Sequence, residues 1–196
     1  MLAYVNLSKN YRLSLMQRTG EYVGSDSIRR IDVSQCNMDT IELHGFPNLV
    51  TAILRSNLIS KVNKETFEKN LLLENVDLSY NSISHINENA LRELKMLKQI
   101  DFSYNMIRRI ERYSFEANDL LTNINLSRNY IELFNSFKSS SLTHLNMSWC
   151  EVMKIDATAL DDMPQLVELD LSNNLFSQLP ALVSSSLQIL DLSMCR

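Results

Sequence analysis

A short phrase of spaced apolar residues, closed by Asn or Cys, recurs nine times along this chain of 196 residues. The closing residue, which we call the ladder position, falls at Asn10, Cys36, Asn57, Asn81, Asn105, Asn129, Cys150, Asn174 and Cys195. The intervals between these positions are 26, 21, 24, 24, 24, 21, 24 and 21 residues. A fixed period of about 20 to 30 residues is the sequence signature of a stacked solenoid.

Each repeat carries the pattern of one short strand. Val76, Asp77 and Leu78 alternate between apolar and polar, as in a half-buried strand. One repeat cannot enclose its own core, so neighbouring repeats must stack and pair their strands in parallel. The prediction is a curved, horseshoe-like α/β-type solenoid with a parallel sheet on its concave face. Its convex segments are expected to be irregular or short helices, each burying one large apolar side chain: Phe46, Phe67, Leu91, Phe115 and Leu160.

The ladder position has a predicted structural role. After each strand the chain must turn inward, which buries backbone groups that have no strand partner. A buried Asn amide can donate to and accept from such groups, so the Asn residues should form a ladder up the stack. Cys36, Cys150 and Cys195 occupy the same position and lie two or more repeats apart, too far to form disulfides. We therefore expect three buried, unpaired thiols, each forfeiting about 0.5–1.5 kcal/mol of hydrogen bonding.

The repeat has a family resemblance. Leu166-Val-Glu-Leu169-Asp-Leu171-Ser-Asn-Asn174-Leu-Phe176 fits the pattern L-x-x-L-x-L-x-x-N/C-x-L and resembles the leucine-rich repeat family. The 24-residue length resembles the typical subclass of animal extracellular receptors and adhesion proteins, such as Toll-like receptor ectodomains and insect chaoptin-like proteins. The resemblance covers essentially the whole chain, although Arg12 stands where the first repeat should have an apolar residue.

The domain organisation follows from the repeat. Residues 1–196 should form a single solenoid of about nine repeats, starting near 2, 28, 49, 73, 97, 121, 142, 166 and 187. The resembled receptors close both ends with cysteine-rich caps, and nothing here matches them. We expect a fragment of a longer ectodomain. The alternative is a short protein with unusual ends, which could form a homodimer through its open last repeat.

One column of outward residues suggests a partner-binding surface. The residue before each ladder position includes, in four consecutive repeats, Tyr80, Tyr104, Arg128 and Trp149. Tyr, Trp and Arg are enriched in protein-binding hot spots. A protein ligand or co-receptor on the concave face is therefore expected, although the aromatic residues could instead only pack on their neighbours. Further candidates are the polar strand residues Gln99 and His144, and Arg55, which interrupts a column of serines.

Two other outward columns are nearly uniform. Asp or Asn precedes the ladder position by four residues and Ser by two, and we expect both columns to solvate the strand edge. Where Asn replaces Asp, the phrase creates Asn-x-Ser sequons at Asn6, Asn125 and Asn146. Glycans on Asn125 and Asn146 would cover the proposed partner surface, so the two expectations compete.

Several function classes are disfavoured. His44, His85 and His144 occupy different repeat positions and cannot converge on a metal, so no metal or cofactor is expected. No phosphate loop or nucleophile elbow occurs, which argues against an enzyme. A net charge of −4 argues against a nucleic-acid partner. The chain contains no signal peptide or membrane-spanning segment, so an extracellular or cell-surface location, in adhesion or innate immunity, is implied by the resemblance alone. The alternative is a cytosolic scaffold or regulatory subunit, which free thiols favour.

Overall fold

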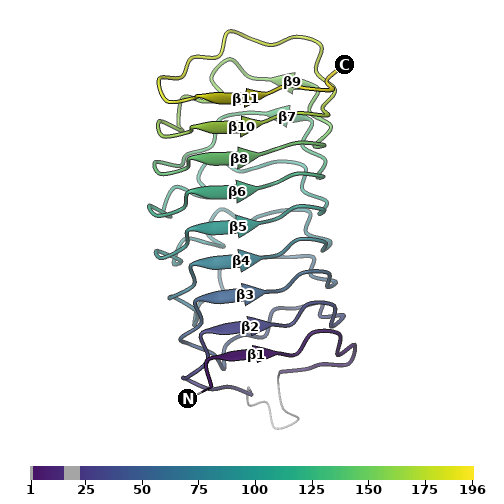
Figure 1. Ribbon diagram of the computed structural model, residues 1–196, viewed down its shortest axis with the longest axis vertical. Coiled ribbons are helices and arrows are strands. Elements are labelled where there is room, and N and C mark those ends of the chain that lie inside the picture. The colour runs from purple at the N-terminus through teal and green to yellow at the C-terminus, as the bar shows by residue number, and fades with distance from the viewer. Residues whose placement is uncertain (1, 16–22) are drawn as a thin grey trace.

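The computed structural model describes residues 2–15 and 23–196, whose backbone coils so that each turn adds one strand to a common sheet (Figure 1). This sheet has nine parallel strands in the order β1-β2-β3-β4-β5-β6-β8-β10-β11. Its strands are Tyr4–Asn6 (β1), Arg30–Asp32 (β2), Thr51–Ile53 (β3), Asn75–Asp77 (β4), Gln99–Asp101 (β5), Asn123–Asn125 (β6), His144–Asn146 (β8), Glu168–Asp170 (β10) and Ile189–Asp191 (β11).

The strand register aligns equivalent repeat positions. In the pair β4 and β5, for example, Val76 lies opposite Ile100 and Asp77 lies opposite Asp101. In this sheet, the central residue of each strand between the two end strands β1 and β11 is buried, whereas the flanking residues face outward. A position that recurs in the sequence therefore forms a continuous column in space. Equivalent residues of adjacent repeats lie one strand spacing apart, ~4.8 Å.

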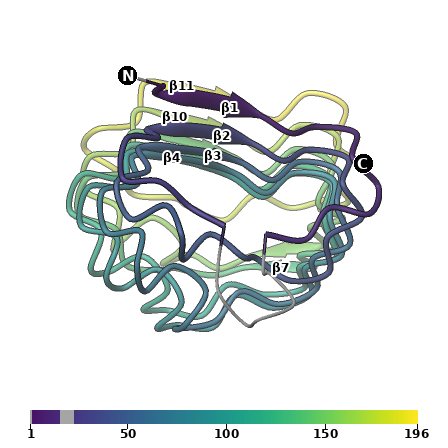
Figure 2. The same ribbon diagram turned by 90° about the horizontal axis from the view of Figure 1, so that it is seen from below.

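The core fills the space between the sheet and the convex turns, which lie opposite each other in the end-on view (Figure 2). The five large convex side chains expected in the core are buried there, Phe115 against Phe137 with ring centroids 5.4 Å apart. Across residues 2–15 and 23–196 the convex segments contain turns and no helix, so the irregular alternative is the one observed. Two short convex strands, Leu133–Phe134 (β7) and Lys154–Ile155 (β9), pair in parallel.

The ladder asparagines tie adjacent turns together. The Asn105 amide nitrogen donates to the carbonyl oxygens of Phe102 in its own turn (2.9 Å) and Leu78 in the preceding one (3.0 Å), and its Oδ1 accepts from the Ile83 amide (2.9 Å). The same inter-turn bonds recur at Asn57, Asn81, Asn129 and Asn174. Each such side chain satisfies buried backbone groups that the sheet leaves unpaired.

The three cysteines keep part of this bonding. All are free thiols, and the Sγ atoms of Cys36 and Cys150 lie 3.2 Å from Leu7 O and 3.0 Å from Leu126 O, where an Asn would place its amide nitrogen. Cys36 and Cys150 are buried, but Cys195 is only partly buried. The expectation of three buried thiols is wrong for Cys195, because no further turn in the described chain packs over it.

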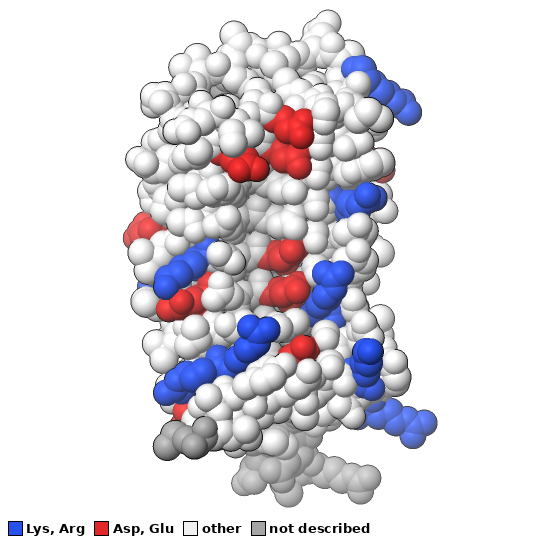
Figure 3. Space-filling model, viewed as in Figure 1, with Lys and Arg blue, Asp and Glu red and all other residues white. Residues whose placement is uncertain are grey.

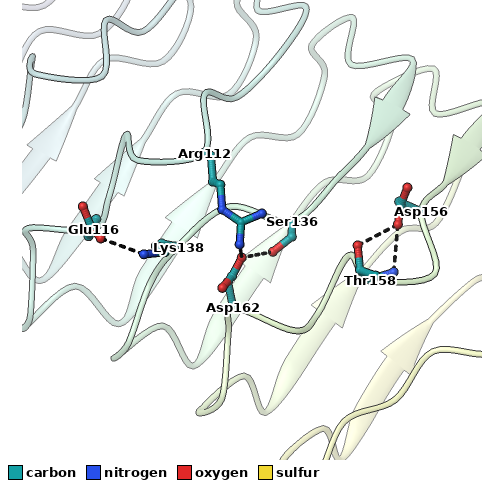
Figure 4. A network of polar contacts seen from close by, with 7 residues as sticks. All are labelled: Arg112, Glu116, Ser136, Lys138, Asp156, Thr158 and Asp162. Carbon is teal, nitrogen blue, oxygen red and sulfur yellow. Dashed lines mark hydrogen bonds and ion pairs between the residues drawn. The ribbon is translucent and has the colours of Figure 1, made fainter.

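Polar contacts on the convex side join different repeats to one another (Figure 4). Asp162 Oδ2 pairs with Arg112 Nη2 at 2.5 Å and accepts a hydrogen bond from Ser136 Oγ at 2.7 Å. Lys138 Nζ lies 3.0 Å from Glu116 Oε1. Since the basic partners are substantially exposed, each ion pair contributes only about 0–1 kcal/mol.

Candidate functional site

The residue before each of the nine ladder positions adopts a left-handed backbone conformation. Its φ is 55° at Tyr80 and Tyr104, 57° at Arg128 and 56° at Trp149, and the same holds at Lys9, Gln35, Ser56, Asn173 and Met194. For a residue other than Gly this conformation costs roughly 1–2 kcal/mol, and it is rare for bulky side chains. The sequence pattern gave no sign of this conformation, because no glycine marks the position.

Hydrogen bonding to the next repeat explains why the strain persists. The amide of Tyr104 donates to the carbonyl of Ser127 at 3.0 Å, and the amide of Arg128 donates to that of Ser148 at 2.9 Å. The left-handed residue thus continues the parallel hydrogen bonding beyond the end of the strand. The next residue then turns inward as the ladder Asn or Cys, while the side chain of the left-handed residue stays outside. Whatever occupies this column is displayed on the rim where the strands end.

Five side chains on this rim form one continuous stack, which we call the stacked row. The rings of Tyr80 and Tyr104 are 3.9 Å apart with an interplanar angle of 15°. The Arg55 guanidinium lies 4.2 Å from the centre of the Tyr80 ring. The Arg128 guanidinium lies 5.1 Å from the centre of the Tyr104 ring and 4.5 Å from that of Trp149. Cation–π contacts of this kind are worth about 0.5–1 kcal/mol at exposed sites.

A groove of about 870 Å³ runs beside the stacked row, and we call it the rim groove. Tyr80, Tyr104, Arg128 and Trp149 form part of its lining, and these three aromatic residues are 38%, 39% and 48% exposed. The other lining residues that were not predicted to be functional include Met106, Tyr130, Glu151 and Leu175. These four directly follow a ladder position, and the exposed Met106 and Tyr130 after a ladder Asn would have been the signal to notice.

Gln99 and His144 lie elsewhere. Both begin a strand and line a second hollow of about 430 Å³ on the face of the sheet, which we call the floor hollow. His144 Nδ1 contacts Thr143 Oγ1 at 2.8 Å, and its Nε2 lies 3.8 Å from Glu168 Oε2. The predicted partner residues therefore divide between two neighbouring surfaces. Figure 3 shows acidic side chains along the middle of this face and basic side chains mainly toward its two edges.

The uniform Asp and Ser columns have a more specific role than solvating the strand edge. Asp77 Oδ1 accepts hydrogen bonds from the Ser79 amide at 2.9 Å and the Ser79 hydroxyl at 2.6 Å. Buried members of the serine column are Ser79, Ser103, Ser148 and Ser172, which corrects the expectation that these serines face solvent. The aspartates thus cap the turn that leads into the left-handed residue.

The sequon asparagines take the same capping position. Asn146 Oδ1 accepts from the Ser148 amide at 2.9 Å, and Asn125 Oδ1 accepts from the Ser127 amide at 3.1 Å. Asn125 and Asn146 line the floor hollow and do not line the rim groove. Asn6 makes the equivalent bond to Ser8 at the first strand.

Two of the described titratable groups have shifted pKa values that follow from their structural positions. Burial raises the pKa of the Cys150 thiol to about 12, which keeps it protonated and unreactive. Hydrogen bonds from the amide and hydroxyl of Thr158 lower the pKa of Asp156, a turn residue on the convex side. Within residues 2–15 and 23–196, no three His, Cys, Asp or Glu side chains are grouped to hold a metal ion. That same part of the chain has no helix long and apolar enough to cross a bilayer.

Solved structures with the same fold include three large solenoids. Over 87% of this chain, InlJ from Listeria monocytogenes superposes with a TM-score of 0.67 at 18% identity, and the match covers 35% of InlJ. A chain of the Toll–Spatzle complex of Drosophila matches 87% of this chain with a TM-score of 0.63 at 19% identity. A chain of the TLR13–ssRNA13 complex matches 86% with a TM-score of 0.70 at 22% identity. The latter two matches cover 27% and 25% of those chains, so this chain spans about a quarter to a third of these neighbours.

Comparison with curated proteins by sequence finds no significant match. The family patterns do match. The pattern described as "Leucine rich repeat" matches residues 47–107, and that described as "BspA type Leucine rich repeat region (6 copies)" matches residues 105–188. Together they cover well over half of the chain, in the segment where the asparagine ladder is most regular. Solenoids of this kind typically act as binding surfaces and not as enzymes. By its repeat, its fold and these matches, the chain belongs to the leucine-rich repeat family.

Proposed function

We propose that this chain is a protein-interaction module of an extracellular or cell-surface receptor, acting in recognition or adhesion. The stacked row and the rim groove would contact a protein ligand or co-receptor. The observation that supports this most is the display of Tyr80, Tyr104, Arg128 and Trp149 in a strained backbone conformation beside an open groove. Strained positions cluster at functional sites, and Tyr, Trp and Arg dominate binding hot spots.

Rigidity favours the stacked row as the contact surface. Each ring or guanidinium in the row is held by its neighbours, so little side-chain entropy would be lost when a partner binds. The floor hollow beneath would then supply polar contacts from Gln99 and His144. This is the arrangement of an apolar and aromatic centre with a polar border that protein interfaces commonly have.

An extracellular location and a role in innate immunity or adhesion are supported by the resemblance to the 24-residue receptor subclass. Toll is solved in complex with Spatzle and TLR13 with ssRNA13. This chain spans only part of those proteins. We therefore propose for it only what the two complexes have in common, a solenoid protein that binds a macromolecule. We propose one solenoid of about nine repeats over residues 1–196, belonging to a longer ectodomain. In that setting Asn6, Asn125 and Asn146 are candidate glycosylation sites. Glycans at the latter two would occupy the floor hollow.

Site-specific photo-crosslinking tests the proposed surface. A benzophenone amino acid replaces Met106 in the rim groove, and a matched variant carries it at Tyr113, which is exposed on the convex side. The chain, displayed on cells, is irradiated and its crosslinked proteins are identified by mass spectrometry. We expect a partner that crosslinks from position 106, not from position 113, and is lost when Trp149→Ala is added. A partner that crosslinks only from position 113 would contradict the proposal.

The cytosolic scaffold remains a second candidate because all three cysteines are free thiols. The coding sequence around this segment distinguishes the two. An upstream signal peptide with a downstream cysteine cap or membrane span is expected. A continuous cytosolic reading frame would favour the scaffold.

A further inference from the structure

The Arg128 guanidinium lies between two aromatic rings, and no described residue is bonded to it in its own plane. Its carbon lies 5.1 Å from the centre of the Tyr104 ring and 4.5 Å from that of Trp149. Within residues 2–15 and 23–196 its side chain makes no hydrogen bond or ion pair. A guanidinium has five N–H donors, all directed outward in its plane. Here the two flat faces are covered and the donors are left free.

Arg55, at the other end of the stacked row, differs in this respect. It lies over only one ring, that of Tyr80, and its Nη1 donates to Ser79 Oγ at 2.9 Å. Arg55 therefore has an acceptor among the described residues, whereas Arg128 has none among them. Glu151 lines the same groove without approaching Arg128 closely enough to form an ion pair.

We propose that Arg128, clamped between Tyr104 and Trp149, is a binding site for a carboxylate carried by the protein partner. This inference rests on the proposed function and names the chemical group of the partner that the rim recognises. Carboxylates match the planar fork of arginine with two parallel hydrogen bonds. Because the rings fix the orientation of the guanidinium and exclude water from its faces, the fork is preorganised for a ligand that approaches in its plane.

The surroundings of Arg128 define the segment that carries the carboxylate. Met106 and Tyr130 line the groove beside it and are 50% and 44% exposed. An acidic side chain flanked by apolar residues in an extended loop would place its carboxylate on Arg128 and its neighbours on Met106 and Tyr130. The partner we infer is therefore a protein that presents an Asp or Glu within an apolar loop.

A nucleic acid would offer anionic groups too, but two features disfavour it. The faces of the Tyr80 and Tyr104 rings are already covered, by Arg55, by each other and by Arg128, so bases cannot stack on them. The adjacent strand column carries Asp77 and Asp101, and the whole chain has a net charge of −4, which would repel a polyanion. A single carboxylate meets much less of this repulsion.

The test uses the intact chain and a phage-displayed library of random heptapeptides. Selected peptides are synthesised, and their binding is followed by the fluorescence of Trp149, the single tryptophan of the chain, which lies against Arg128. We expect selection of peptides with one fixed Asp or Glu. Changing that residue to its amide should weaken binding about tenfold or more, as expected for a hydrogen-bonded charge pair. Arg128→Gln should weaken peptide binding to the same extent. Arg128→Lys should restore little of the affinity, because lysine lacks the planar guanidinium that makes two parallel hydrogen bonds.

A double-mutant cycle makes the test specific. If the carboxylate binds Arg128, amidating the peptide should have almost no further effect in the Arg128→Gln chain. Arg108→Gln serves as the matched control, since Arg108 is exposed and outside the rim groove. Additive losses, or binding that needs no acidic residue, would overturn the carboxylate site. If such binding still depended on Tyr104, the proposed protein-binding role of the rim would stand.

The remaining outcomes are also decisive. If no selected peptide changes the fluorescence of Trp149, the result would count against both the carboxylate site and the proposed function. Binding of a fluorescein-labelled 20-nucleotide oligouridine that is lost in Arg128→Gln would overturn the protein carboxylate in favour of a nucleic-acid phosphate.

Discussion

The rings of Tyr80 and Tyr104 stack with their centroids 3.9 Å apart, closer than the roughly 4.8 Å that separates adjacent strands. The two rings therefore lean toward each other instead of following the backbone spacing. Their hydroxyl groups interact as well: a hydrogen bond with Tyr104, together with partial burial, raises the pKa of Tyr80. The pair is the centre of the stacked row.

Substituting Tyr104 with Phe should lower the pKa of Tyr80. The substitution keeps the ring stack but removes the hydroxyl that raises this pKa, while the nearby Arg55 continues to lower it. NMR titration of ¹³Cζ-labelled tyrosine would measure the shift. Tyr130→Phe, which removes a rim hydroxyl outside the stack, is the control and should leave the titration of Tyr80 unchanged. An unaltered Tyr80 titration in Tyr104→Phe would refute the assignment.

Substituting Cys150 with Asn should stabilise the protein. An Asn there could donate to Leu126 O, as the thiol does at 3.0 Å, and could also accept from the Ile131 amide, which a thiol does poorly. The expected gain is about 0.5–1.5 kcal/mol, seen as a higher urea midpoint. The reciprocal change, Asn105→Cys, removes the acceptor for Ile83 and should lower the midpoint by a similar amount. If both changes were destabilising, steric fit and not hydrogen bonding would control the ladder position.

The stability of the protein should fall above pH 9, partly through Cys150. Burial raises the pKa of this thiol from 9.0 to about 12 in the folded state. The unfolded chain therefore releases the proton first as the pH rises. The stabilising contribution is complete below pH 9 and is lost between pH 9 and 12, by roughly 1.4 kcal/mol at pH 10. Urea midpoints at pH 8 and pH 10 should differ more for the natural chain than for Cys150→Ala; equal differences would exclude this thiol as a contributor.

Substituting Ser56 with Gly should be stabilising, which is unusual for glycine. Ser56 has a φ of 56°, so Gly would relieve a strain of roughly 1–2 kcal/mol. The greater freedom of Gly in the unfolded chain offsets about 0.5–1 kcal/mol of this gain. A net rise in the urea midpoint, worth about 0.5–1 kcal/mol, is expected. Ser60→Gly, in the same repeat but outside the left-handed positions, should lower the midpoint. A fall in both variants would mean that the left-handed backbone is not strained.

Recurrence in the sequence was enough to predict the stack of repeats, the parallel sheet and the roles of the ladder residues. These features depend on which positions are apolar and on the period, and both are visible in a single chain. The same period is sufficient to align Tyr80, Tyr104, Arg128 and Trp149 in one column. The confirmed family and fold come from this same pattern.

Several features depend on contacts between repeats that the pattern does not encode. Asn70 donates to the carbonyls of Leu43 and Phe46, and Asn118 to those of Leu91 and Leu94, which makes a second set of asparagine bonds on the convex side. Since other repeats have Leu or Met at this position, the sequence alone suggested only core packing.

In the stacked row, too, some features follow from the sequence and others only from the tertiary structure. The sequence by itself determined that two tyrosines, an arginine and a tryptophan would lie on one edge of a parallel sheet, because a fixed period places equivalent residues in one column. Only the tertiary structure decided that this column is left-handed, that its side chains cover one another's faces, and that no described residue accepts a hydrogen bond from the Arg128 guanidinium. The physical reason is that backbone handedness and ring contacts are set by hydrogen bonds and packing between repeats, which no single repeat contains.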